Sequence, residues 1–257
     1  MLIAVCQNPE ALGAAAAKHT ANLLRFAIRH NGRARLVLST GASQFETLSE
    51  LVKEDIDWTK VEMFHLDEYI GLPKSHIASF EKYLSERFVK KAPGVTAYFV
   101  PNDPSQLPAL NERILSAPID VGLIGIGQNA HIAFNDPPAD FSVALPYITV
   151  TLDERCKSQQ VQEGWFESIE LVPKQAITMS VRQILSCRHI VSAVPHREKA
   201  EAVRKTLCED VSSMTPATVL KTHEDFSLFV DRDSFSAVNE QMIRPAHVGD
   251  AFQLLHL

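Results

Sequence analysis

Short apolar segments alternate with longer segments of helical pattern along most of this 257-residue chain. The apolar segments are predicted strands and comprise residues 2–6, 35–38, 61–65, 120–125, 147–152, 189–194 and 227–230. Helical patterns follow several of them, at residues 9–30, from residue 43, and at residues 79–89 and 195–207. Strands that alternate with helices form parallel βαβ units. The alternation therefore predicts an α/β fold with a doubly wound, mostly parallel, Rossmann-like sheet that has helices on both faces.

Local signals mark where some of these elements begin and end. Asn8 is suited to cap the first helix, and Gly32 follows its last turn, where a glycine commonly ends a helix. Ser43 and Glu46 have the spacing of a capping box, which predicts that the second helix begins at Ser43. Residues 66–78 carry a glycine, a proline and several polar side chains, so we expect a long loop there.

Composition narrows the class of protein. No linker rich in glycine and serine divides the chain, so residues 1–257 are interpreted as a single domain, and a homo-oligomer stays open. The net charge of −6 argues against a nucleic-acid-binding protein, which usually has a basic face. We expect a cytoplasmic protein because no apolar run is long enough to span a membrane and the N-terminus has no signal-peptide pattern. The four scattered cysteines favour reduced, mostly buried thiols over disulfides or a metal site.

Ligands of doubly wound sheets bind outside the carboxyl ends of the strands, and four loops of interest lie there. The first is residues 39–43, where Gly41 allows a tight turn and the start of a helix offers amide groups that suit a phosphate. Lys199, in the first turns of the helix that follows residues 189–194, can add a positive charge. Taken alone, the loop is more typical of an ordinary strand–helix turn without a ligand, and Lys199 is more typical of an exposed lysine on a helix.

Asp67 and Glu68 directly follow the strand at residues 61–65. A carboxylate in a partly closed pocket can act as a general base if it reaches the proton. An arbitrary acidic pair is more often a solvated turn. The position at the carboxyl end of a strand favours the catalytic interpretation here.

The loop at residues 125–136 begins with Gly125 and Gly127, which let the backbone approach a ligand closely. Its G-x-G-x-x-A pattern also leaves dinucleotide binding weakly open. His131 is flanked by the amide of Asn129 and the carboxylate of Asp136. A carboxylate can orient an imidazole, so His131 and Asp136 are a candidate acid/base pair, although a lone histidine is more often structural.

With these loops in view, the chain resembles the glucosamine-6-phosphate deaminase family, within a wider group that also contains 6-phosphogluconolactonases. LDEYIGLP at residues 66–73 and GIGQNAHIAFND at residues 125–136 carry most of the match. STGAS at residues 39–43 and Lys199 add to it, and the HIAFND ending favours the deaminase branch. The resemblance implies conversion of an amino-sugar 6-phosphate to fructose 6-phosphate and ammonia. It implies a small sugar phosphate as ligand and no metal or cofactor.

The resemblance also implies roles for individual residues. Asp67 matches the general base that moves a proton between C2 and C1, and His131 matches the histidine that helps to open the pyranose ring. Asp136 and Asn129 complete the implied catalytic group. The implied substrate-binding residues are Thr40, Gly41, Ala42, Ser43, Glu68, Gly125, Gly127 and Lys199.

Four positions depart from the family pattern. Asn129 stands where an aspartate is frequent, Ala130 where a glycine is usual, and Asp136 where a glutamate is usual. Gln160 stands where some members carry a phosphate-binding arginine. Three alternatives to glucosamine-6-phosphate deaminase therefore remain: a galactosamine-6-phosphate isomerase, a 6-phosphogluconolactonase, and a sugar-phosphate sensor with weak catalysis.

Overall fold

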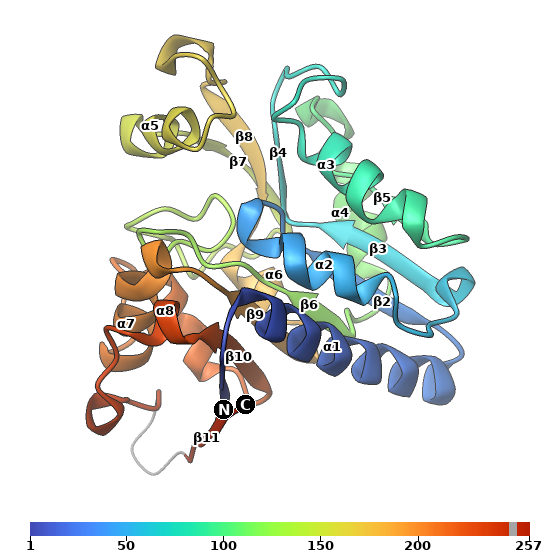
Figure 1. The fold of residues 1–257 in the computed structure, drawn as a ribbon. Coiled ribbons are helices and arrows are strands. Elements are labelled where there is room, and N and C mark those ends of the chain that lie inside the picture. Colours follow the sequence, from blue (N-terminus) through green and yellow to red (C-terminus); the bar gives the residue numbers. More distant parts are fainter. Residues whose placement is uncertain (247–250) are drawn as a thin grey trace.

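An eight-stranded parallel sheet forms the centre of the fold (Figure 1). The computed structural model describes residues 1–246 and 251–257. The strand order is β11-β1-β10-β9-β6-β2-β3-β5. The strands are β1 (Leu2–Cys6), β2 (Ala34–Leu38), β3 (Val61–His65), β5 (Thr96–Tyr98), β6 (Val121–Leu123), β9 (His189–Val194), β10 (Phe226–Asp231) and β11 (Gln253–His256). Strands β5 and β11 were not predicted, and each occupies an edge of the sheet.

Helices cover both faces of this sheet, as the sequence predicts (Figure 1). Alternate residues of β1 show the two faces, because Ile3 and Val5 belong to one buried apolar cluster and Ala4 and Cys6 to the other. On the Ala4 side lie α1 (Pro9–Asn31), α2 (Phe45–Leu51) and α3 (Phe80–Arg87). On the Ile3 side lie α4 (Leu107–Leu115), α6 (Val181–Leu185), α7 (Ala200–Cys208) and α8 (Arg232–Phe235). The doubly wound α/β prediction is confirmed.

Helix α1 has the ends that its sequence predicts. The Asn8 side chain accepts a hydrogen bond from the Ala11 N–H, which satisfies one of the free amides of the first turn. Gly32 has a left-handed conformation with φ of 75° and donates its N–H to the Ile28 carbonyl.

Within the described residues, no helix combines the length and apolarity that crossing a bilayer requires.

A second, antiparallel sheet stands beyond the carboxyl ends of the parallel strands (Figure 1). It has the order β4-β8-β7, with β4 (Asp67–Tyr69), β8 (Gln175–Met179) and β7 (Tyr147–Thr151). Two predictions are corrected here. Residues 66–78 are not a loop throughout, because β4 pairs with β8. The strand predicted at residues 147–152 exists, but it pairs antiparallel with β8 and does not join the parallel sheet.

The predicted capping box at Ser43 and Glu46 is also wrong. A 3₁₀ turn at Ala42–Gln44 precedes α2, and no side-chain hydrogen bond caps either element. Glu46 instead packs against Gly13 of α1, whose missing side chain leaves room for it, since a Cβ there would lie 2.6 Å from the Cβ of Glu46. Close packing of the two helices therefore replaces the local cap. The helix predicted at residues 195–207 likewise begins with a 3₁₀ turn at Arg197–Lys199.

The topology places a cleft between two neighbouring strands. From β2 the chain moves outward through β3 to β5, whereas from β6 it moves the other way through β9 and β10. The loops that follow β2 and β6 therefore diverge at a topological switch point. In open α/β sheets such a point is where ligands bind.

Candidate active site

One cleft collects residues from all four of the loops singled out in the sequence. Its walls come from the segments that follow β2, β3, β6 and β9, and from the region of α5 (Glu154–Gln162). Nine of the predicted site residues line it: Thr40, Gly41, Ala42, Ser43, Asp67, Gly125, Gly127, His131 and Lys199. Asn129 and Asp136 do not line the cleft but contact the Nδ1 atom of His131. Glu68 is the one predicted site residue that neither lines the cleft nor contacts His131.

The loop after β2 offers free backbone donors. Gly41 has φ of 101° and ψ of 165°, a conformation that only glycine adopts readily. The first amides of a helical turn have no partner inside the turn, so the N–H groups of Ala42 and Ser43 are available at the cleft. This arrangement suits an anion, as the sequence predicts.

Lys199 is the one lysine or arginine among the described residues that line the cleft. Burial lowers the pKa of Lys199, while the carboxylates of Glu163 and Glu198 act in the opposite direction. Both of these glutamates also line the cleft, so the ammonium group of Lys199 lies in a site that also holds negative charge.

Asp67 is 7% exposed and sits where β3 leads into β4. Burial raises the pKa of Asp67 to about 8, and the neighbouring charge of Glu68 contributes to the rise. A carboxyl group with a pKa near neutrality can both take up and return a proton under physiological conditions. Burial thus gives this residue a pKa that suits a general base.

Glu68 has a structural position instead. Its side chain accepts hydrogen bonds from Tyr69 N, Ser79 Oγ and Glu81 N, at 2.9 Å each. Ser79 is the N-cap of α3, so Glu68 ties β4 to the beginning of that helix. Its carboxylate does not contact the cleft, and the structure gives no support for the predicted contact with substrate.

His131 is held by two acceptors on one side of its ring. Its Nδ1 lies 2.5 Å from Asn129 Oδ1 and 3.2 Å from Asp136 Oδ1. Because both neighbours are acceptors, Nδ1 carries the proton, and in the neutral ring Nε2 is left free to accept one. Asn129 Nδ2 also donates to Asp136 Oδ1 over 3.0 Å, which fixes the direction of the amide. An asparagine at this position is therefore sufficient to orient the histidine.

Asp136 completes this group. Burial by itself would raise the pKa of Asp136, but hydrogen bonds from His131 and Asn129 outweigh it and hold the pKa below the ordinary value. The carboxylate therefore stays ionised and can stabilise a protonated imidazole. The nearby Cys156 thiol of α5 acts in the same direction on the pKa of this carboxylate.

The two glycines of the loop after β6 serve the protein's own packing. A Cβ at Gly127 would lie 2.3 Å from Nε2 of His131, so the imidazole occupies the space that a side chain would need. A Cβ at Gly125 would lie 3.4 Å from Ser39 Oγ, where the loops after β2 and β6 meet. Residues 124–146 contain no helix, so the G-x-G-x-x-A pattern lacks the helix start on which dinucleotide binding depends.

The cleft also contains His196, which had no usable sequence signal, and Gln160, which the sequence marked only as a departure from the family pattern. His196 has φ of 78° and ψ of 149°, a strained conformation for a residue with a side chain, and donates its N–H to Asp231 Oδ2. Gln160 of α5 is buried, and its Oε1 accepts the Tyr69 hydroxyl over 2.7 Å. Its amide nitrogen is thereby left for the cleft. Helix α5 begins where the Asp153 side chain accepts a hydrogen bond from the Cys156 N–H.

The fold and the cleft together define a class of protein. It is an α/β protein in which a carboxyl group, an oriented histidine and a lysine beside free amides can bind a small anion and transfer protons on it. The chain belongs to the family of glucosamine-6-phosphate isomerases and 6-phosphogluconolactonases, whose family model matches residues 7–228.

Individual relatives agree with this assignment. The chain is 33% identical to glucosamine-6-phosphate deaminase 1 of Bacillus subtilis, over 92% of this chain and 99% of that protein. It is 30% identical to glucosamine-6-phosphate deaminase of Staphylococcus epidermidis, over 80% and 88% of the two chains. The solved structure of a monomeric glucosamine-6-phosphate deaminase has a TM-score of 0.84 and 30% identity, covering 92% of this chain and all of that one.

A more distant structure shares the fold alone. A 6-phosphogluconolactonase of Shewanella baltica has a TM-score of 0.75 at 20% identity, and covers 90% of this chain and 97% of its own. The family assignment and the fold expected from the sequence are confirmed.

Proposed function

We propose that the protein converts glucosamine 6-phosphate to fructose 6-phosphate and ammonia. The observation that carries this proposal is the meeting in one cleft of Asp67, with its raised pKa, and His131, with a free Nε2. Isomerisation with loss of an amine needs a base for the carbon acid and a second group for ring opening. Identities of 30–33% with proteins named glucosamine-6-phosphate deaminase support the same reaction.

The proposed steps are proton transfers and one hydrolysis. The phosphate is bound by the amides of Ala42 and Ser43, the hydroxyls of Thr40 and Ser43, and Lys199. His131 takes the proton of the anomeric hydroxyl through Nε2 and returns a proton to the ring oxygen, which opens the ring. Asn129 and Asp136 keep the imidazole in the correct tautomer and stabilise its charged form.

Asp67 then removes the proton from C2 and delivers it to C1. The substrate's ammonium group gives a proton to the C1 oxygen, so the electrons of the broken C2–H bond pass through an enediol-type intermediate that carries an amine at C2. When C1 receives its proton, C2 becomes an iminium carbon. Water adds to C2, the C2–N bond breaks, and ammonia leaves with the proton that water supplies. The products are fructose 6-phosphate and ammonia.

Ammonia release from the purified protein tests this proposal. Glucosamine 6-phosphate is expected to give ammonia and fructose 6-phosphate in equal amounts. Galactosamine 6-phosphate and 6-phosphogluconolactone serve as parallel substrates. Background ammonia from glucosamine 6-phosphate, together with turnover of either parallel substrate, would reassign the substrate. Binding of all three without turnover would instead identify a sugar-phosphate sensor.

A further inference from the structure

The hydroxyl of Tyr83 makes a buried contact with the loop that lines the cleft. Tyr83 lies on α3, is 7% exposed, and donates its hydroxyl to the Gly41 carbonyl over 2.7 Å. Burial raises the pKa of Tyr83, so the hydroxyl keeps its proton and remains a donor. Gln44 N donates to the same carbonyl over 3.1 Å. A carbonyl oxygen has two lone pairs, and both are therefore occupied.

This contact fixes the direction of the Gly41–Ala42 peptide. In a trans peptide the carbonyl and the following N–H point in opposite directions. The carbonyl of Gly41 is directed toward Tyr83, so the N–H of Ala42 is directed away from it. Among the described residues this N–H has no acceptor, and Ala42 lines the cleft. The unusual conformation of Gly41, with φ of 101°, allows the peptide to take this orientation.

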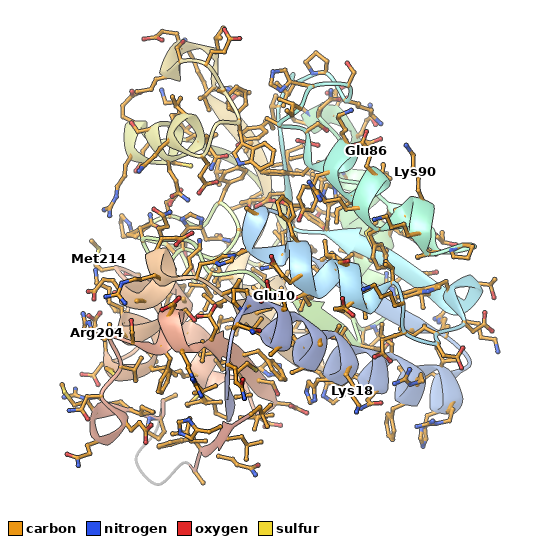
Figure 2. The ribbon with its side chains drawn as sticks, in the orientation of Figure 1. Glu10, Lys18, Glu86, Lys90, Arg204 and Met214 are labelled. Carbon is orange, nitrogen blue, oxygen red and sulfur yellow. The ribbon has the colours of Figure 1, made fainter. Side chains whose placement is uncertain are left out.

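An aromatic stack holds the Tyr83 ring in place. The ring stacks on Phe45 of α2, with centroids 5.8 Å apart and an interplanar angle of 20°. The Arg87 guanidinium covers both rings, 3.8 Å from the Phe45 centroid and 5.2 Å from the Tyr83 centroid. Glu86 and Lys90 project outward from the same segment of chain (Figure 2). Packing of the ring on α3 therefore fixes the direction of the Tyr83 hydroxyl, in contrast to Glu86 and Lys90, which point away from the protein (Figure 2).

We propose that Tyr83 is a positioning residue, whose hydroxyl orients the Gly41–Ala42 peptide so that the Ala42 N–H binds the phosphate of the substrate. This inference rests on the proposed function only for the identity of the natural ligand, a sugar phosphate. The affinity of the protein for phosphate reports the effect of Tyr83 directly, whether or not ammonia is released. Loss of the hydroxyl removes one of the two hydrogen bonds that hold the Gly41 carbonyl, so the Ala42 N–H is less firmly oriented toward the bound anion.

Tyr83→Phe tests the assignment because it removes the hydroxyl and keeps the stacked ring. We expect the Kd for inorganic phosphate, measured by calorimetry, to rise about three- to tenfold, as loss of one hydrogen bond predicts. The KM for glucosamine 6-phosphate should rise by the same factor, with kcat within about twofold. Unchanged phosphate affinity with a lower melting temperature would show a merely structural tyrosine and overturn the inference.

Two further variants serve as controls. Tyr98→Phe is matched to the test variant, since Tyr98 stacks on Phe64 at 5.1 Å beneath Arg113, 4.5 Å away, and lies outside the cleft. It is expected to leave phosphate affinity unchanged. Arg87→Met removes the positive charge above the stack and should do the same; a rise equal to that of Tyr83→Phe would assign the effect to Arg87 and refute the role of the hydroxyl.

Failure of the inference and failure of the proposed function give different results. Wild-type protein that binds inorganic phosphate but releases no ammonia would refute the deaminase proposal, and the comparison of phosphate affinities would still decide the role of Tyr83. Wild-type protein that binds neither phosphate nor sugar phosphate would refute both.

Discussion

Replacement of Asp67 by asparagine should abolish catalysis and stabilise the folded protein. The reason is that the native state buries this carboxyl group, which raises its pKa to about 8, whereas the unfolded chain exposes it. The pKa of this group is about 4 in the unfolded chain and about 8 in the native state. At any pH between these two values, unfolding releases one proton from the group. A raised native pKa contributes stability that is complete below the unfolded value and is lost as the pH rises toward the native value.

The magnitude follows from proton linkage. One proton released on unfolding lowers the free energy of unfolding by about 1.4 kcal/mol for each pH unit. Asp67→Asn lacks this contribution, while the other titrating groups are common to both proteins. The free energy of unfolding of the variant relative to wild type should therefore increase by about 3 kcal/mol between pH 5 and pH 7.

Urea unfolding at pH 5, 6 and 7, followed by circular dichroism, measures this difference. Parallel pH dependences for wild type and variant would show that Asp67 ionises freely in the folded protein, and would refute its assignment as a base of raised pKa. In wild type, kcat/KM for ammonia release should rise about tenfold per unit below pH 8, because the base must be ionised. Glu68→Gln should move this limb to lower pH, which separates Asp67 from titration of the substrate itself.

Three other predictions concern the cleft. Lys199→Ala should raise the KM for glucosamine 6-phosphate about ten- to hundredfold with a smaller fall in kcat in steady-state assays, since it removes a charge-assisted contact made throughout the reaction. Gln160→Leu should raise the same KM about three- to tenfold because the cleft loses one amide donor, and an unchanged KM would remove Gln160 from the substrate contacts. His196→Gly should be more stable than His196→Ala by about 1–2 kcal/mol in urea unfolding, because only glycine adopts φ of 78° with ψ of 149° without strain. An alanine variant more stable than the glycine variant would contradict that account.

The parallel core was predictable because its signals are local. Continuous apolar runs, the Asn8 cap and Gly32 each act within a few residues, and together they define β1, α1 and the strands that follow. The position of the cleft follows from the same information, since parallel strands direct their carboxyl ends to one edge.

The antiparallel sheet was not predictable because its pairing is distant in the sequence. Strand β4 has three residues, and its partner β8 lies more than a hundred residues further along the chain. No periodicity is visible in a segment so short. The sequence marked Gln160 only as a departure from the family pattern, and its place in the cleft also depends on this sheet, since the Tyr69 hydroxyl of β4 donates to its Oε1. The structural position of Glu68 likewise depends on contacts with α3.

The departures from the family pattern make physical sense as a set. Asn129 replaces a negative charge with an amide, and Gln160 replaces a positive charge with an amide. Set against a member with both charged residues, the two changes together leave the net charge of these positions unchanged. Asn129 still accepts the hydrogen bond from Nδ1 of His131, and this is what orients the imidazole. A second carboxylate is not needed for this, because Asp136 already lies beside Nδ1. Burial raises the pKa of Asp67 and so reduces its negative charge, which leaves Glu163 and Glu198 as the cleft carboxylates that oppose an incoming phosphate. We therefore expect a single lysine with oriented amides to suffice for binding the anion.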